Sequence, residues 1–352
     1  MRIYLSNLCN SQVRIAVGRG SLEGLREINE DAFLLYSKRI DPGVVTDKIP
    51  RISGLMSIDD GEPAKDIEYV INILRRIHRE TSPDLEWIIA MGGGTIMDIG
   101  GFIASIYRRG VKLANIPTTL LGMVDASMGG KNGVNLDGVK NVIGTFYQPR
   151  LVISDTIFLR TLPREEISNG SAEIIKYCMT LDRDLCYILE KSFEKIFSLD
   201  DDALEEIIYR SAVNKMRVVE TDERDDRGIR IVLNYGHTIG HAIEAGSGFR
   251  INHGRAISLG MICEAKLAEE LGFIGSNVIS YLERLLRLYN LPTSREELGA
   301  RVDLAKAVEA LRRDKKRRRG LIKIPVLKEI GAWEKMDLEM EVLEGCLKKC
   351  VG

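Results

Sequence analysis

Two histidines, His237 and His241, stand four residues apart in the segment NYGHTIGHAIE at residues 234–244. This spacing places both side chains on one face of a helix. A third, His253, follows twelve residues after the second, and the chain has only four histidines in total. Three histidines in so short a stretch predict a metal or acid–base site.

The ligands of such a metal remain open at this point. A catalytic zinc usually takes three protein ligands and keeps one position free. One ligand set uses all three histidines. Another uses one helical histidine, His253 and a carboxylate, which leaves the other helical histidine for acid–base work. The candidate carboxylate is Glu173 in NGSAEIIKY, although Lys176 one turn later would make the two an ordinary ion pair if they were exposed.

A glycine-rich turn follows an apolar run in WIIAMGGGTIMDIGGFIAS, residues 87–105. Glycines between a strand and a helix let phosphates approach backbone N–H groups at the positive end of the helix. In IPTTLLGMVDASMGGKNGVN (116–135), Thr118 and Thr119 follow a second β-type run, with Asp125 and Lys131 beyond. Such polar groups after consecutive strands suit a nucleotide at the carboxyl edge of a sheet. Together the two segments predict a dinucleotide site.

The elements that must hold these residues change in character near residue 160. Before it, helical patterns such as 64–80 alternate with β-type runs at 33–37, 87–92, 111–117 and 150–155. This alternation predicts a parallel, Rossmann-like sheet with covering helices. After it, helical periodicity dominates, apart from a strand or hairpin arm at 320–327. We predict an α/β nucleotide-binding domain at 1–160, a mainly α-helical metal- and substrate-binding domain at 161–352, and an active site in the cleft where they meet.

The composition of the 352 residues favours a soluble globular protein. The net charge of −1 arises from many charges of both signs, so neither nucleic acid nor an anionic membrane is an expected partner, despite the basic run RRDKKRRR at 312–319. No run of eighteen apolar residues predicts a membrane span, and the start lacks the apolar core of a signal peptide. Six cysteines without a CxxC pair predict reduced thiols in a cytoplasmic protein, with a Cys346–Cys350 bond as the less favoured alternative.

From about residue 60 to 331, the order of the motifs resembles the 3-dehydroquinate synthase family. The resemblance is carried by DGEPAK, GGGTIMDIGGFIA, RRG, IPTTLLGMVDASMGGK, VKNVIGTFYQP, FLRTLP, GSAEIIKY, LNYGHTIGHAIE, HGRA and RRDKK. It implies a dehydroquinate synthase-like fold and a lyase that converts 3-deoxy-D-arabino-heptulosonate 7-phosphate to 3-dehydroquinate and phosphate. NAD would be reduced and reoxidised within each turnover. The reaction would be the second step of the shikimate pathway to aromatic amino acids.

The resemblance also implies roles for individual residues. Its metal, Zn²⁺ or Co²⁺, would be bound by Glu173, His237 and His253, whereas His241 would face the substrate. NAD would contact Asp60, Glu62, Lys65, Gly93, Gly94, Thr95, Ile96, Met97, Asp98, Thr118, Thr119, Lys131, Lys140, Phe158, Leu159, Arg160 and Thr161. The substrate would contact Arg109, Asp125, Lys131, Asn141, Lys176, Lys215, Arg230, Asn234, His241, Lys315 and Lys316. Arg109 matches an arginine that reaches the neighbouring subunit's site, which implies a homodimer.

A few positions depart from the family's usual pattern: Pro63, Asn132, Val139 and one additional residue within 222–230. None of them removes an expected ligand or charged substrate contact. The alternatives are sugar phosphate cyclases acting on sedoheptulose 7-phosphate or glucose 6-phosphate, and then NAD- and metal-dependent polyol dehydrogenases of related fold. Lys215, Arg230 and Asn234 favour a substrate that carries a carboxylate.

Overall fold

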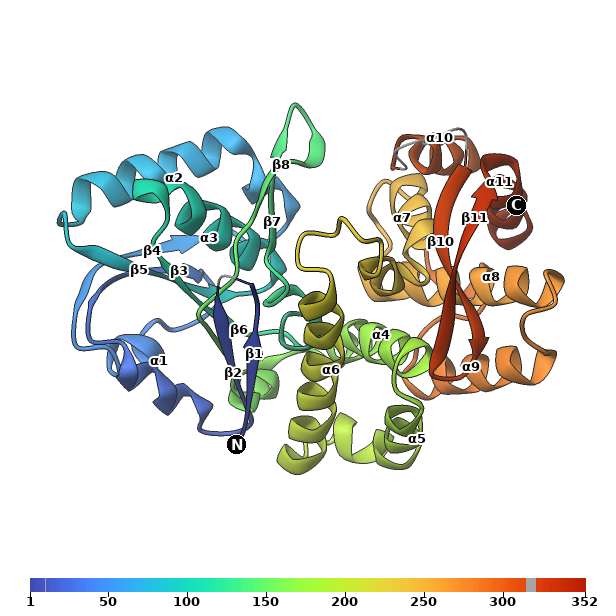
Figure 1. Cartoon of the computed structure of the whole chain (residues 1–352), viewed down its shortest axis with the longest axis horizontal. Helices are drawn as coiled ribbons and strands as arrows, with labels where there is room; N and C mark the ends of the chain where they lie inside the picture. The colour runs from blue at the N-terminus through green and yellow to red at the C-terminus, as the bar shows by residue number, and fades with distance from the viewer. Residues whose placement is uncertain (10, 315–320) are drawn as a thin grey trace. The chain divides into compact units, whose positions relative to one another are not determined.

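The computed structural model describes residues 1–9, 11–314 and 321–352, and the chain divides into two compact units. The first unit comprises Met1–Pro163 and Leu199–Arg224, and the second comprises Arg164–Ser198 and Asp225–Gly352. The prediction of two continuous domains, 1–160 and 161–352, therefore differs from this division at Leu199–Arg224. The colours of Figure 1 follow the chain through both units.

The first unit is built on a seven-stranded sheet in the order β1-β2-β9-β6-β5-β3-β4. Only β1 and β2 pair antiparallel, and the other pairs in this sheet are parallel. The strands are β1 (Arg2–Asn7), β2 (Gln12–Val17), β3 (Asp31–Ser37), β4 (Ile52–Ile58), β5 (Leu85–Gly92), β6 (Lys112–Pro117) and β9 (Leu151–Ser154). The central strands are almost wholly buried, as expected for a parallel sheet covered on both faces. The predicted α/β fold is confirmed.

Helices α2 (Ile67–Glu80) and α3 (Gly94–Ile106) lie over one face of this sheet, above the strands in Figure 1. The helix α2 begins later than the predicted residue 64, because the Asp66 side chain caps it by accepting from the N–H of Glu68. A short helix, α1 (Gly43–Thr46), lies between β3 and β4 in the chain.

Helix α6 (Asp201–Thr221) explains why the first unit is discontinuous in sequence. It packs against β1 and β2 at one edge of the sheet (Figure 1). The Glu220 carboxylate accepts hydrogen bonds from the hydroxyls of Tyr4 (3.0 Å) and Ser6 (2.6 Å), and Glu205 lies 2.8 Å from the amino group of Met1. Polar contacts with the first residues of the chain therefore hold α6 to the first unit.

A separate hairpin, β7 (Lys131–Leu136) and β8 (Val139–Phe146), lies against α3. A Cβ at Gly101 of α3 would be 1.8 Å from the side-chain oxygen of Asn132, so only glycine admits this approach. The Asn132 amide nitrogen donates to the backbone oxygens of Gly130 and Tyr147, both at 3.0 Å. Asn132, a departure from the family pattern, thus ties the two ends of the hairpin together.

The second unit is mainly α-helical, as predicted. Its helices are α4 (Arg164–Thr180), α5 (Arg183–Phe197), α7 (His237–Gly246), α8 (His253–Glu270), α9 (Ser276–Leu288), α10 (Leu304–Asp314) and α11 (Met340–Val351). The strand predicted at 320–327 appears as β10 (Leu321–Glu329), which pairs antiparallel with β11 (Ala332–Glu339). No helix in the described part of the chain has the length and apolarity needed to cross a bilayer.

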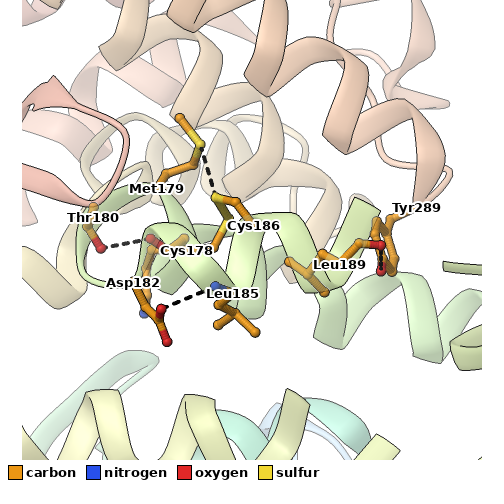
Figure 2. Close-up of a disulfide and its surroundings, with 9 residues drawn as sticks. Cys178, Met179, Thr180, Asp182, Leu185, Cys186, Leu189 and Tyr289 are labelled. Atoms are coloured by element: carbon orange, nitrogen blue, oxygen red, sulfur yellow. Dashed lines mark hydrogen bonds between the residues drawn. A yellow bond between two sulfur atoms is a disulfide. The ribbon is translucent and has the colours of Figure 1, made fainter. Parts of the chain in front are cut away.

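The cysteines contradict the prediction of reduced thiols. Disulfides join Cys178 to Cys186 and Cys263 to Cys350, so Cys346 is not bonded to Cys350. Figure 2 shows the first, which links the end of α4 to the start of α5. The second ties α11 to α8. Spacing along the sequence could not show these pairs, because each depends on how the helices pack.

Candidate functional site

The two segments predicted to bind a dinucleotide meet at the carboxyl edge of the sheet. Strands β5 and β6 end in register at Gly92 and Pro117, and the N–H of Thr118 donates to the Gly92 oxygen at 2.9 Å. The strand β4 ends at the same edge, where Asp60 accepts from the Ser37 hydroxyl at 2.7 Å. Asp60 and Thr118 therefore follow strands of one sheet at the edge where α/β folds bind nucleotides.

The helix that follows this turn offers its positive end to the same edge. Gly93 is the N-cap of α3 without a capping side chain, so the N–H groups of Gly94 and Thr95 point out of the first turn. The side chains of Ile96 and Met97 are buried in the core of the first unit. If these two residues contact a cofactor, they must do so through their backbone.

A polar cluster lies beside the β7–β8 hairpin. The ammonium of Lys65 is 2.6 Å from the Asp98 carboxylate, 3.8 Å from Glu62, and hydrogen-bonded to the side-chain oxygen of Asn141. Lys140 lies 3.9 Å from the second oxygen of Glu62. The structure thus brings together four of the predicted NAD contacts and one predicted substrate contact.

The hairpin also borders a cavity of about 280 Å³. Its lining includes Asp98, Lys131 and Asn141, three of the residues predicted to bind cofactor or substrate. Charged and amide side chains at the mouth of a cavity of this size suit a polar small molecule.

Lys215 of α6 reaches a second predicted substrate residue of the first unit. Its ammonium lies 2.9 Å from the Asp125 carboxylate and donates to the Asp125 backbone oxygen at 2.8 Å. Asp125 lies on a single π-helical turn, Gly122–Ala126, which follows β6. The Thr119 hydroxyl accepts from the N–H of Gly122 and so supports this turn. The placement of α6 is what joins Lys215 to the carboxyl edge of the sheet.

The remaining predicted contacts of the first unit differ in how they are placed. Phe158 and Leu159 are buried, Arg160 pairs with Asp201 at 3.0 Å, and the Thr161 hydroxyl donates to the Phe158 oxygen. Arg109 is exposed, and its backbone has a φ of +69°. A left-handed conformation at a non-glycine residue costs free energy, so the surrounding structure maintains the Arg109 backbone in this conformation at that cost.

In the second unit, Glu173, His237 and His253 converge on one point. The Glu173 carboxylate, fully buried on α4, has one oxygen 3.2 Å from Nε2 of His237 and 3.1 Å from Nε2 of His253. Each histidine is the first residue of its helix, α7 or α8. The other carboxylate oxygen pairs with the buried ammonium of Lys176. The Glu173–Lys176 pair is therefore buried, and it is not the ordinary exposed ion pair that was the alternative to a metal ligand at Glu173.

The Nδ1 atoms of His237 and His253 also have hydrogen-bond partners. Nδ1 of His237 lies 3.1 Å from the backbone oxygen of Tyr235, and Nδ1 of His253 lies 3.0 Å from the Glu244 carboxylate. Both oxygens accept hydrogen bonds, so each Nδ1 carries a proton and Nε2 is the nitrogen left to bind a metal. Two Nε2 atoms and a carboxylate oxygen then face one another, an arrangement that holds either a proton or a metal cation between them. Two imidazoles and one carboxylate are a ligand set of catalytic zinc.

The electrostatics of this cluster also favour a bound positive charge. Burial raises the pKa of Glu173, but Lys176 and His237 outweigh it and hold that pKa well below its usual range. Burial lowers the pKa of His237. Burial would lower the pKa of His253 too, yet in the metal-free protein hydrogen bonds to Glu173 and Glu244 raise it to about 10, so a metal bound at Nε2 replaces a proton there. The donor set therefore fits the divalent metal that the sequence implied.

Glycines let α7 and α8 approach closely enough to bring their histidines together. A Cβ at Gly260 of α8 would lie 2.0 Å from the backbone oxygen of Gly236, and a Cβ at Gly240 would lie 3.1 Å from Cα of Ile257. The carboxylate of Glu264, buried on α8, accepts from the N–H of Gly236 at 2.8 Å. This anchors the chain just before His237.

The other predicted substrate residues of the second unit have mixed placements. The ring of His241 lies 5.3 Å from that of His237, and Lys176 and Arg230 are buried. Asn234 ends a short 3₁₀ helix, Arg230–Asn234, that precedes α7. Lys315 and Lys316 lie outside the described residues. Glu244 had no predicted role, although it follows His237 by two helical turns in the same motif.

Comparison with known proteins gives one family for the whole chain. The family model for the N-terminal part of 3-dehydroquinate synthase matches residues 55–169, and the model for the C-terminal part matches residues 170–317. The chain is similar to the 3-dehydroquinate synthase of Sulfurisphaera tokodaii, with 50% identity over 352 residues and all of both chains covered.

Solved structures show the same fold at lower identity. A 2-deoxy-scyllo-inosose synthase complexed with carbaglucose-6-phosphate, NAD⁺ and Co²⁺ has a TM-score of 0.88 and 23% identity, and the match covers 99% of this chain and 100% of the other. A 2-epi-5-epi-valiolone synthase from Streptomyces hygroscopicus with NAD⁺ and Zn²⁺ has a TM-score of 0.85 and 24% identity over 98% of each chain. The family models and the identity over the full length carry the assignment: the chain belongs to the 3-dehydroquinate synthase family.

Proposed function

We infer that the chain converts 3-deoxy-D-arabino-heptulosonate 7-phosphate to 3-dehydroquinate and phosphate, the second step of the shikimate pathway. The observation that carries this inference is the 50% identity over the full length with a relative named 3-dehydroquinate synthase. The reaction oxidises the substrate at C5, eliminates phosphate, reduces C5 again, opens the ring and closes a carbocycle by an intramolecular aldol step. It therefore consumes no oxidant overall.

We propose that the carboxyl edge of the sheet binds NAD. Support comes from the positive end of α3, from the Thr118 and Asp60 positions beside it, and from the Lys65 cluster. Bound NAD would take the hydride from C5 and return it after elimination. The residues of this unit would hold the cofactor so that the same hydride is recovered.

We propose that Glu173, His237 and His253 bind Zn²⁺, with Co²⁺ as a functional substitute. Their converging donor atoms and the carboxylate–imidazole composition support this proposal. Bound zinc would polarise the substrate's hydroxyl groups and ease their deprotonation. His241, one turn after His237, would face the substrate and leave the metal to the other two histidines.

The substrate's carboxylate and phosphate require positive charge and hydrogen-bond donors. We propose that Lys131, Asn141, Lys176, Lys215, Arg230, Asn234, Asp125 and one or both of Lys315 and Lys316 contact this substrate. Lysine and arginine are the side chains best suited to hold phosphate and carboxylate groups. Binding then imposes most of the geometry for the later steps, because all reacting groups belong to one bound molecule.

We also propose a homodimer in which Arg109 contributes to the site of the partner subunit. The exposed side chain and left-handed backbone of Arg109 support this proposal. We further propose a cytoplasmic location, which suits an enzyme of amino-acid biosynthesis that needs NAD.

One assay tests the reaction. The protein is incubated with the heptulosonate phosphate and a catalytic amount of NAD⁺, and phosphate release and NADH absorbance are followed together. Phosphate release without net NADH is the expected result. Stoichiometric NADH would indicate a polyol dehydrogenase. Conversion of sedoheptulose 7-phosphate or glucose 6-phosphate, with no turnover of the heptulosonate, would indicate another sugar phosphate cyclase.

A further inference from the structure

Glu244 lies near the end of α7 and contacts a residue of the next helix. Its carboxylate is 3.0 Å from Nδ1 of His253, and only 15% of its side chain is exposed. None of the roles assigned above includes Glu244. Its position nevertheless links the two helices that carry the histidine ligands.

The contact determines which nitrogen of His253 can bind a metal. A carboxylate accepts hydrogen bonds and donates none, so Nδ1 of His253 carries the proton. Nε2, which lies 3.1 Å from Glu173, is then the nitrogen left to bind a metal. The backbone oxygen of Tyr235 does the same for His237 from a distance of 3.1 Å. One ligand is thus oriented by a backbone group, and the other by a side chain that can be replaced.

We propose that Glu244 is a positioning residue for the metal site: it fixes the tautomer and ring orientation of His253 so that Nε2 faces the metal. This inference rests on the proposed metal site of Glu173, His237 and His253. A carboxylate on the outer nitrogen of a histidine ligand also makes that ligand more basic. Glu244 therefore raises metal affinity without touching the metal.

A rival arrangement would make Glu244 itself a ligand. The donor atoms of His241, Glu244 and His253 also lie within 4.8 Å of one another. The two ring nitrogens of His253 point in different directions, so a single metal cannot take both. The convergence of Nε2 atoms from His237 and His253 on the same oxygen of Glu173 favours the first set.

The test measures metal affinity rather than activity. Zn²⁺ and Co²⁺ are titrated into the metal-free protein against a chelator of known affinity, for the wild type and the variants Glu244→Ala and Glu244→Gln. Glu244→Ala is expected to bind about 10–100-fold more weakly. Glu244→Gln should lose less, because its amide oxygen still accepts from Nδ1. Glu270→Gln is the matched control, because it also removes one negative charge. Glu270 lies on α8 and forms a surface ion pair with Lys349.

The Co²⁺ absorption spectrum separates positioning from ligation. The band positions in Glu244→Ala should match those of the wild type at saturating Co²⁺, because the three ligands are unchanged. Affinity equal to the wild type in both Glu244 variants would overturn the inference, as would metal loss as complete as in His253→Ala or a shifted spectrum. If the wild type binds neither metal, the proposed metal site fails as well. Thermal unfolding of the metal-free variants checks that they fold, and Glu244→Gln keeps the test valid if Glu244→Ala does not.

Discussion

The three clustered histidines differ in the helical position from which they reach the site. His237 and His253 each begin a helix and direct Nε2 to Glu173, whereas His241 lies one turn inside α7. Replacement of His237 or His253 by alanine should abolish stoichiometric zinc, because each variant removes one of the three proposed ligands. His241→Ala should retain zinc and lose activity.

Metal content after dialysis, measured by mass spectrometry together with phosphate release, checks this prediction. His78, the remaining histidine, lies on α2 of the first unit and provides the control variant His78→Ala. Equal metal loss in all three clustered variants would show that His241 is a ligand and that the assignment to Glu173 is wrong.

The sequence could limit the candidate metal ligands to three histidines and Glu173, but it could not decide which three of these four residues bind the metal. The i, i+4 spacing of His237 and His241 is compatible with a shared metal. What separates them is the buried carboxylate of Glu173, which comes from α4 and meets the histidines only in the folded chain. The role of Glu244 depends on a contact between α7 and α8, so spacing within its own motif could not reveal it.

The contact of α7 with α8 depends on glycine at positions 240 and 260. Gly260→Ala should lower the free energy of unfolding by about 1–3 kcal/mol, since its Cβ would lie 2.0 Å from the Gly236 oxygen and push the helices apart. It should also weaken zinc binding, because the separation moves His253 relative to His237.

Chemical denaturation and chelator competition measure the two effects. Gly345→Ala in α11 is the matched control, because nothing lies within 4 Å of its added Cβ. That variant should be unchanged or up to about 1 kcal/mol more stable, as expected for alanine in a helix. Zinc affinity unchanged in Gly260→Ala would show that the ligands do not depend on this contact.

The strands of the large sheet that the sequence predicted are the ones buried within it. The runs predicted as β3, β5, β6 and β9 are apolar because these strands are buried in the sheet. The strands missed were β1, β2, β4, β7, β8 and β11, and several of them are largely exposed or rich in polar residues. The strand β11, AWEKMDLE, forms by pairing with β10, so its own composition carries little β signal.

Both disulfides belong to the second unit, and they close loops of very different length. The Cys263–Cys350 bond spans 87 residues and the Cys178–Cys186 bond spans 8. In the chain-entropy model the longer loop stabilises more, by about 2 kcal/mol. The double variant Cys263→Ala/Cys350→Ala should therefore be less stable than Cys178→Ala/Cys186→Ala by about that amount.

Denaturant unfolding of the oxidised proteins measures the difference, and thiol titration of the unfolded wild type counts its free cysteines. Two free thiols are expected, from Cys9 and Cys346. Six free thiols would contradict the cross-links, and equal stability of the two double variants would contradict the loop-length argument.

The division of the chain into two compact units could be predicted from the sequence only in part. The change from alternating strands and helices to helices alone placed a boundary near residue 160, and the first segment of the first unit ends at Pro163. The return of Leu199–Arg224 to that unit was missed. Like α5 before it, α6 has the residue pattern of a helix, and its partners Tyr4 and Ser6 stand more than two hundred residues earlier.

That return of the chain has a consequence for how the protein is made. The last strand of the large sheet, β9, is synthesised well before α6. The ribosome synthesises α4 and α5 of the second unit in between. Until residue 224 emerges, Tyr4 and Ser6 lack the Glu220 carboxylate that accepts their hydrogen bonds. The first unit of the nascent chain thus lacks α6 at one edge of its sheet, while residues of the second unit have already left the ribosomal tunnel.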